Sequence, residues 1–297
     1  MDKYKLIALY CYICDCYDTH LKWYCQRFSN NISEPKFTDA ECLTIYLFSI
    51  IEEEKFKISS IHNYAVKYLG DWFPDLPSYQ AFNSRLNRLA NVFPPLICLL
   101  LNDVEKHGIQ LNTSLIDSMP IITCSHKPAG RIAPELTDKG FCSTKNMHYW
   151  GVKLHAIAFR RQKRLPVPEY FGISAASAHD LNPVRYIFEK MAGRKIYADK
   201  AYSDKDLKEL LSKEFNTCLL TPVKLVRGQS QWERQFNKAA DDLFSTAVSK
   251  VRQPIESLFN WLIEKTDIQR ASKVRSSNGL LVHIFGKLAA AIAIWVF

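Results

Sequence analysis

Three acidic residues stand where the local pattern would present a carboxylate at the edge of a hydrophobic core. Asp117 and Asp199 each end a short strand-like run, and Glu256 lies on an amphipathic helix. Two strand-end aspartates and one helical glutamate form the oxygen ligand set that hard divalent cations prefer. Two such ions about 4 Å apart clamp the attacking and leaving oxygens of an in-line phosphoryl transfer. If the three side chains converge, they predict an enzyme that cuts and joins nucleic acid.

Each carboxylate also has a simpler interpretation. Asp117 could be a turn or cap residue, and Asp199 could form a surface ion pair with Lys200 or Lys205, which would contribute little. Glu256 could form only a helix pair with the residue four positions earlier, worth roughly 0.3 kcal/mol. Against this, Glu256 lies beside an apolar stripe at the spacing of a buried helix face. The stripe consists of Val251, Ile255, Leu258, Phe259 and Leu262.

The elements that must position these residues belong to two regions. Residues 1–105 read as helical, with a capping box at Thr38 and Glu41 and helix caps expected at Ser59 or Ser60 and at Ser78. The helix after Ser78 is expected to run to Phe93 and to stop at the prolines that follow it. It carries Gln80, Asn83, Arg85, Asn87 and Arg88, which suits a helix-turn-helix-like DNA reader. An ordinary helical bundle with a solvated face is the alternative.

Residues 106–297 follow a different pattern. Strand-like runs occur at 111–117, 149–159, 169–175, 194–199 and 217–223. A helix capped by Asp180 is expected to run to Met191, and Ser203 is expected to cap another. Pro120 is expected to limit pairing of the first strand. Pro254 is expected to start or kink the last long helix. The order predicts an α/β (α+β) fold with a mixed five-stranded sheet flanked by helices, preceded by an all-helical N-terminal domain.

Composition and charge limit the class of protein. A chain of 297 residues with 47% hydrophobic content supports one large domain or two ordinary ones. The net charge of +9 suggests a polyanionic partner. Nine cysteines without regular spacing indicate reduced, intracellular thiols, and Asp15 and Asp18 argue against a signal peptide. The apolar stretch 280–297 is expected to be a buried terminal helix, so we expect a cytoplasmic protein without membrane contact.

Basic residues are dense between the first two carboxylates. Residues 121–164 hold Lys127, Arg131, Lys139, Lys145, Lys153, Arg160, Arg161, Lys163 and Arg164. Such density recruits phosphate backbones, although solvated loops are the alternative. Trp232, with Arg234 and Gln235 beside it, suits stacking on an unpaired base, and core packing of Trp232 is equally consistent. We assign DNA contacts to Arg85, Arg88, Lys145, Lys153, Arg160, Arg161, Arg252 and Lys265.

Two cysteine and histidine clusters are weaker candidates for a metal site. Cys11 and Cys14 have zinc-ligand spacing, with Cys16, His20 and Cys25 nearby, but no second pair of this kind follows. The other cluster would consist of Cys142, His148, His155 and His179. His155 and His179 are better explained as supporting residues on the active-site side of the sheet, or as hydrogen-bonded core histidines.

The order and context of the three acids resemble insertion-sequence transposases of the DDE type from prokaryotes. The motifs that carry the resemblance are 115–118, 151–155, 178–180, 199–202 and 252–259. The resemblance implies an RNase H-like catalytic core over 106–297, in which Asp117, Asp199 and Glu256 bind two Mg²⁺ ions that Mn²⁺ can replace. Many relatives carry a Tyr and a Lys where this chain has Ser249 and Ile263. Lys265 lies two residues further on and about 200° round the helix.

The resemblance also implies an activity and its partners. Such an enzyme cleaves the ends of the element in double-stranded DNA and joins the released 3′-OH to target DNA, as a homodimer on DNA in the bacterial cytoplasm and nucleoid. Two alternatives stay open at this point. One is a non-catalytic DNA-binding regulator derived from a decayed copy, and the other is an RNase H-like nuclease without strand transfer.

Overall fold

The computed structural model describes residues 2–25, 35–124, 132–142, 146–224, 228 and 230–297, without the side chains of Glu233 and Arg234. Its internal contacts divide the chain into two compact units. The first contains residues 1–105, 131–135 and 262–297, and the second contains residues 106–130 and 136–261. The C-terminal segment therefore groups with the N-terminal helices. The assignment of residues 1–105 to DNA binding and of 106–297 to catalysis stays a prediction.

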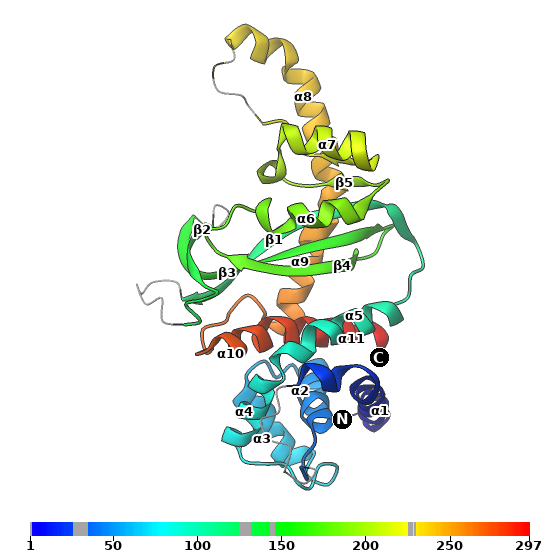
Figure 1. Ribbon diagram of the computed structural model, residues 1–297, viewed down its shortest axis with the longest axis vertical. Helices are drawn as coiled ribbons and strands as arrows, with labels where there is room; N and C mark the ends of the chain where they lie inside the picture. Colours follow the sequence, from blue (N-terminus) through cyan, green and yellow to red (C-terminus); the bar gives the residue numbers. More distant parts are fainter. Residues whose placement is uncertain (1, 26–34, 125–131, 143–145, 225–227, 229) are drawn as a thin grey trace. The chain divides into compact units, whose positions relative to one another are not determined.

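The first unit is helical, as the sequence predicts (Figure 1). Its N-terminal part consists of α1 (Lys3–Thr19), η1 (Leu21–Tyr24), α2 (Asp39–Glu53), α3 (Ile58–Tyr68), α4 (Tyr79–Arg88), η2 (Ala90–Val92) and α5 (Phe93–Asp103). The capping box before α2 is confirmed, because the hydroxyl of Thr38 accepts a hydrogen bond of 3.1 Å from the backbone N–H of Glu41. Ser78 caps α4, as predicted.

Two predicted helix boundaries in this unit are wrong. Helix α3 begins at Ile58 after Lys57, so neither Ser59 nor Ser60 is its cap. Helix α4 ends at Arg88, and the two prolines after Phe93 open α5 instead of ending α4. Proline is favoured in a first helical turn because the amide hydrogen it lacks would have no partner there.

The C-terminal segment forms α10 (Ser277–Leu281), a π-helical turn η6 (Val282–Gly286) and α11 (Lys287–Val296). Within the described chain, Ser277–Val296 is the one stretch long and apolar enough to cross a membrane. Of its 18-residue apolar segment, 61% is buried inside the protein. Helix α11 packs against α2 and α5, and its residues 287–293 are all buried. The expected buried terminal helix is confirmed.

The second unit contains a mixed sheet of six strands among the described residues, one more than predicted. The strands are β1 (Ile109–Cys124), β2 (Asp138–Cys142), β3 (Met147–Arg161), β4 (Val167–Ala175), β5 (Lys195–Tyr197) and β6 (Cys218–Leu220). The order is β2-β3-β1-β5-β6, and β4 also pairs with β3. The missed strand is β2, whose short sequence around Gly140 has no β-branched residue and a single aromatic one, Phe141.

Strand β1 is longer than predicted and contains Pro120. Strand β5 pairs with β1 only from Thr113 to Leu115, so beyond that point β1 has a single strand neighbour, β3. Proline is tolerated in a strand where one edge makes no ladder. The register therefore continues through Pro120, which lies opposite Lys153 of β3.

One face of the sheet carries a buried core formed by short helices and α7 (Lys205–Phe215) (Figure 1). The predicted helix from Asp180 to Met191 is divided into η3 (Asn182–Val184), α6 (Arg185–Phe188) and η4 (Glu189–Met191). The short helix η5 (Lys200–Tyr202) follows β5, and α8 (Gln231–Arg252) and α9 (Pro254–Thr266) complete the set. Ile116 of β1 belongs to the core under α6 and α7, so its neighbour Asp117 points to the opposite face.

Candidate active site

Asp117 lies in β1, and Asp199 follows the end of the neighbouring parallel strand β5. Leu115 of β1 pairs with Tyr197 of β5, and each aspartate comes two residues later in its chain. Both acids thus lie just beyond the paired segment, and Asp199 is near enough to raise the pKa of Asp117. Catalytic and ligand-binding groups concentrate at such carboxyl ends of parallel strands. The structure therefore brings these two predicted residues together.

Arg252 joins Asp117 to Glu256. One guanidinium nitrogen donates to the carboxylate of Asp117, and the other donates to Oε1 of Glu256 at 2.6 Å. The Arg252 side chain is 13% exposed and that of Asp117 is 18% exposed, whereas Glu256 is 52% exposed. The helix pair expected from the sequence is thus present, but it is part of a three-residue network that reaches the sheet.

A break in the helix sets this geometry. Helix α8 ends at Arg252 and α9 begins at Pro254, in agreement with the prediction for that proline. The backbone N–H of Glu256 bonds to the carbonyl of Gln253 at 3.0 Å, which closes the first turn of α9. Ile255 is fully buried beside it. Burial of Ile255 fixes the helix, so the side chains of Arg252 and Glu256 are held toward Asp117.

The electrostatics show that all three acids surround one position. The pKa of Asp117 is raised to about 6, chiefly by burial and also by Asp199 and Glu256, against the lowering effect of Arg252 and of the N–H of Ser118. Burial lowers the pKa of Arg252, but Asp117, Glu256 and Asp199 together raise it above its ordinary value. A charged guanidinium therefore lies among three carboxylates from three separate segments of the chain.

A second polar cluster supports Asp117 from the other face of β1. The backbone N–H of Ser118 donates to Asp117 at 2.9 Å, and the Ser118 hydroxyl donates to Asp180 at 3.0 Å. Lys153 pairs with the same oxygen of Asp180 at 3.0 Å and donates to the carbonyl of Ala178 at 2.8 Å. The sequence prediction of Asp180 as a helix cap is wrong. Its occurrence in a motif with His179 was the signal that could have indicated a role near the site.

Tyr202 is a further residue that the sequence reasoning did not select. It is buried, and burial together with Asp180, Asp117 and Asp199 raises its pKa well above the ordinary value. Its phenol is therefore a neutral donor close to the acids. Its position directly after Asp199-Lys200-Ala201 could have suggested this.

The two candidate histidines have different surroundings. His155 is fully buried with Nε2 2.8 Å from the Ser174 hydroxyl, and burial lowers its pKa to about 4, so the ring is neutral at pH 7. It lies next to Ala156, the residue opposite Asp117, and so points to the other face of the sheet. His179 is exposed and accepts a hydrogen bond from the N–H of Leu181 at 3.4 Å. Support of the active site by these histidines stays a prediction.

The donor chemistry of the site suits a hard divalent cation, because all three candidate ligands are carboxylates. In the described part of the chain, no group of three His, Cys, Asp or Glu side chains is already arranged as a metal site. The guanidinium of Arg252 lies between Asp117 and Glu256 and supplies the positive charge there. A metal ion would therefore have to displace this guanidinium from at least one carboxylate.

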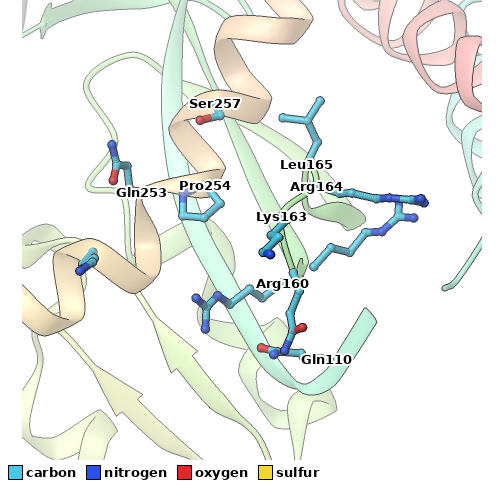
Figure 2. Close-up of a pocket in the computed structure, with 11 residues that line it drawn as sticks. Gln110, Arg160, Lys163, Arg164, Leu165, Gln253, Pro254 and Ser257 are labelled. Carbon is cyan, nitrogen blue, oxygen red and sulfur yellow. The ribbon is translucent and has the colours of Figure 1, made fainter. Parts of the chain in front are cut away.

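The basic residues predicted to contact DNA are distributed over several places. Arg160 and Arg161 line a basic pocket in the second unit (Figure 2). Lys153 faces Asp180, and Arg252 faces the acids. Lys145, and also Lys127 and Arg131, lie outside the described residues, as does the side chain of Arg234.

The predicted DNA-binding residues of the first unit are partly engaged within the protein. Arg85 donates to the carbonyl of Phe37 and lies 3.5 Å from Asp39, and Arg88 is exposed. Lys265 lies 3.8 Å from Glu54. Arg85 therefore holds the segment before α2 against α4, while Arg88 is available at the surface.

The structure also bears on the two proposed Cys/His metal clusters and on the packing of Trp232. Cys11, Cys14 and Cys16 lie along α1, and neither proposed Cys/His cluster forms a metal site in the region that the structure describes. Trp232 is 70% exposed and stacks on Phe236, with ring centroids 5.3 Å apart, so core packing of Trp232 is wrong.

Comparison with models of protein families identifies the family of this chain. A family model described as a transposase DDE domain matches residues 107–276, which is more than half of the chain and contains Asp117, Asp199 and Glu256. No curated protein and no solved structure gives a significant match.

Proposed function

Because the chain belongs to the family of transposases that carry a DDE domain, we propose that it cleaves DNA at the ends of a mobile element and joins the released 3′-OH to target DNA. Asp117, Asp199 and Glu256 are the proposed catalytic and metal-binding residues. Transposase DDE domains generally use divalent metal ions. Two Mg²⁺ ions, or Mn²⁺ in their place, would activate a water molecule and neutralise charge on the scissile phosphate.

The proposal rests on the environment of Arg252. Its guanidinium is influenced by three carboxylates that come from β1, from the end of β5 and from α9. Burial is the main cause of the raised pKa of Asp117, Arg252 opposes it, and Asp199 and Glu256 add to it, so holding Asp117 charged at this position costs free energy. Such strain is typical of functional sites, where perturbed carboxylates cluster.

The protein's own residues have defined roles in this proposal. Asp117 within β1 and Asp199 just after β5 would hold metal ions, and Glu256 would complete the ligand set from the more exposed side. Arg252 balances the charge of the acids before metal binds and is positioned to contact a DNA phosphate afterwards. Phosphoryl transfer of this kind depends on positioning and charge neutralisation, so neither a covalent protein–DNA intermediate nor ATP is required.

We further propose that the protein acts as a homodimer on double-stranded DNA, because the two ends of an element must be cut together. Its place of action would be the bacterial cytoplasm, on nucleoid DNA. Short inverted repeats in the DNA that flanks the coding region would supply the end sequences for cleavage and binding assays.

The decisive test replaces Asp199 with asparagine, which keeps the size of the side chain and removes its charge. We expect Asp199→Asn to reduce Mg²⁺-dependent cleavage of end DNA to background while DNA binding stays nearly unchanged. Asp206→Asn, on the exposed first turn of α7, is the matched control and should cleave as the wild type does. Unchanged cleavage by Asp199→Asn would overturn the assignment.

A second assay separates the transposase from the two alternatives. A pre-cut end with a free 3′-OH is supplied together with target DNA, and joined product is measured. Joining supports transposition, whereas cleavage without joining would indicate a nuclease. End-specific binding without cleavage at any Mg²⁺ or Mn²⁺ concentration would indicate a DNA-binding regulator.

A further inference from the structure

A pocket of about 830 Å³ in the second unit is lined by five cationic side chains (Figure 2). They come from the end of β3, the loop after it and the end of α8, and are Arg160, Arg161, Lys163, Arg164 and Lys250. None of the described residues that line the pocket is acidic. Five like charges around one cavity repel one another, so the pocket is built for a polyanion.

The other lining residues favour a phosphodiester backbone over bases. Gln110, Gln162, Gln253 and Ser257 contribute amide and hydroxyl groups, which bond well to phosphate and sugar oxygens. No aromatic side chain is among the described lining residues, so the pocket offers no platform on which a base could stack. The pocket would therefore bind DNA without reading its sequence.

The pocket shares its framework with the carboxylates. Asp117 lies opposite Ala156 of β3, and Arg160 is four residues further along the same strand. Residues four apart in a strand are about 13 Å apart. At the other side of the pocket, Gln253 directly follows Arg252 in the chain, and Ser257 directly follows Glu256. One strand and one helix start thus hold both the acids and the pocket.

We infer that this pocket binds the backbone of the DNA strand about three to five nucleotides from the scissile phosphate and fixes its register at the carboxylates. The distance follows from the separation of about 13 Å and a rise of about 3.4 Å per nucleotide. The inference rests on the proposed function, which takes DNA as the substrate and the acids as the site of cleavage. It goes further by assigning Lys163, Arg164, Lys250, Gln253 and Ser257 to DNA and by stating which phosphates they contact.

The experiment uses the full chain with Lys163→Gln and Lys250→Gln combined, because both lysines are exposed and their loss should not disturb folding. Lys190→Gln, also exposed and on the short helix η4, is the matched control. Binding of end DNA is measured without divalent ions at several salt concentrations. The slope of log K against log salt is negative, and loss of two phosphate contacts should make it less steep by about 1.8, whereas the control should leave it unchanged.

Neutral methylphosphonate linkages then locate the contact. Placed one at a time along the end DNA, they should weaken binding of the wild type most at three to five nucleotides from the cleavage site. The double variant should be insensitive to the same linkages. An unchanged salt slope, or equal sensitivity of the variant and the wild type, would overturn the inference.

Competition with inorganic phosphate tests whether the pocket prefers the free ion to a DNA backbone. Inorganic phosphate at constant ionic strength should not abolish the difference in DNA binding between the variant and the wild type. If it does, the pocket is a site for free phosphate and the inference is wrong. Because binding is measured without metal ions, failure of the wild type to cleave DNA would contradict the proposed function without affecting this result.

Discussion

Arg252, the last residue of α8, forms an ion pair with Asp117 of β1, although 135 residues separate them in the chain. Both side chains are largely removed from water, with exposures of 13% and 18%. Breaking such a pair leaves an uncompensated charge in a poorly solvated place. Arg252 therefore stabilises the acid cluster in the absence of metal ions.

Replacing Arg252 with glutamine should make the acid cluster depend on metal ions. The three carboxylates would lose their internal cation, so the pKa of Asp117 should rise above its present value of about 6. We expect the metal-free variant to unfold at a lower temperature than the wild type, and Mg²⁺ to raise its melting temperature more. Thermal unfolding with and without Mg²⁺ measures both effects.

Arg185→Gln is the control for this prediction. Arg185 also pairs with a carboxylate, Asp204 at 2.7 Å, but its side chain is 53% exposed. Exposed pairs contribute about 0–1 kcal/mol, so this change should alter neither stability nor the response to Mg²⁺ appreciably. An equal response of both variants to Mg²⁺ would show that the ion does not bind at the acids.

The raised pKa of Asp117 predicts how stability depends on pH in the metal-free protein. Between pH 3.8 and about 6 the folded protein retains a proton that the unfolded chain has released, so stability falls as pH rises through this window. At pH 7 the loss is on the order of 3 kcal/mol. Asp117→Asn lacks this titration, so its stability relative to the wild type should rise by that amount between pH 4 and pH 7. The loss of the Asp117 carboxylate beside Arg252 adds a cost that does not depend on pH in this range.

Urea unfolding of both proteins at several pH values tests this expectation. The comparison must be a difference between the two, because burial lowers the pKa of His155 to about 4 and of His283 to about 3. These histidines make stability rise with pH between about 3 and 6.5 in both proteins, and the effect cancels in the difference. A difference that does not change with pH would show that Asp117 is ionised without cost.

The sequence predicted the parts of the site that depend on local pattern. The loop after Asp199 and the helix start at Pro254 were predicted correctly, whereas Asp117, expected at a strand end, lies within β1, which continues to Cys124. The parallel pairing of β1 with β5, which brings Asp199 near Asp117, could not be predicted, because the sequence does not show which strands are neighbours in the sheet. Only the folded sheet determines that.

The roles of Arg252 and Asp180 were missed for the same reason. Each has a plausible local partner or function in the sequence: a residue four positions along the helix for Arg252, and a helix cap for Asp180. Contacts with β1 override both. The short strand β2 was missed because its sequence has no strand-forming pattern of its own and pairs only with β3.

Lys287 offers a test of the first unit that is independent of the acids. Its side chain is 2% exposed, and its ammonium donates to the carbonyl of Asp267 at 3.0 Å. Burial lowers its pKa to about 8, while Asp267 raises it. The unfolded chain binds more protons between pH 8 and 10.5, so stability should rise with pH over that range.

Lys287→Met should therefore stabilise the protein at pH 7, by on the order of 2 kcal/mol after loss of the hydrogen bond is included. The gain should largely disappear by pH 10.5, where the wild-type lysine is neutral in the folded protein and half deprotonated in the unfolded chain. Urea unfolding at pH 7 and 10.5 measures this. Lys273→Met, at an exposed position of the same unit, should change stability little at either pH. Destabilisation by Lys287→Met at pH 7 would show that the hydrogen bond outweighs the buried charge.

The exposed pair of aromatic rings on α8 predicts that a substitution there can weaken DNA binding without changing the stability of the fold. Trp232 and Phe236 are 70% and 74% exposed and stack at an interplanar angle of 15°. Because little of Trp232 is buried, Trp232→Ala should change stability by less than about 0.5 kcal/mol. If Trp232 stacks on an unpaired base, the same change should weaken binding of DNA with an unpaired end by about 1–3 kcal/mol.

Fluorescence anisotropy with a fully paired duplex and with a duplex carrying an unpaired end distinguishes the two contributions. Binding of the fully paired duplex should be unaffected by Trp232→Ala. Leu243→Ala is the matched control, because Leu243 is 74% exposed on the same helix but has no ring to stack on a base. Equal losses in the two variants, or a loss that does not depend on the unpaired end, would show that this surface of α8 does not bind bases.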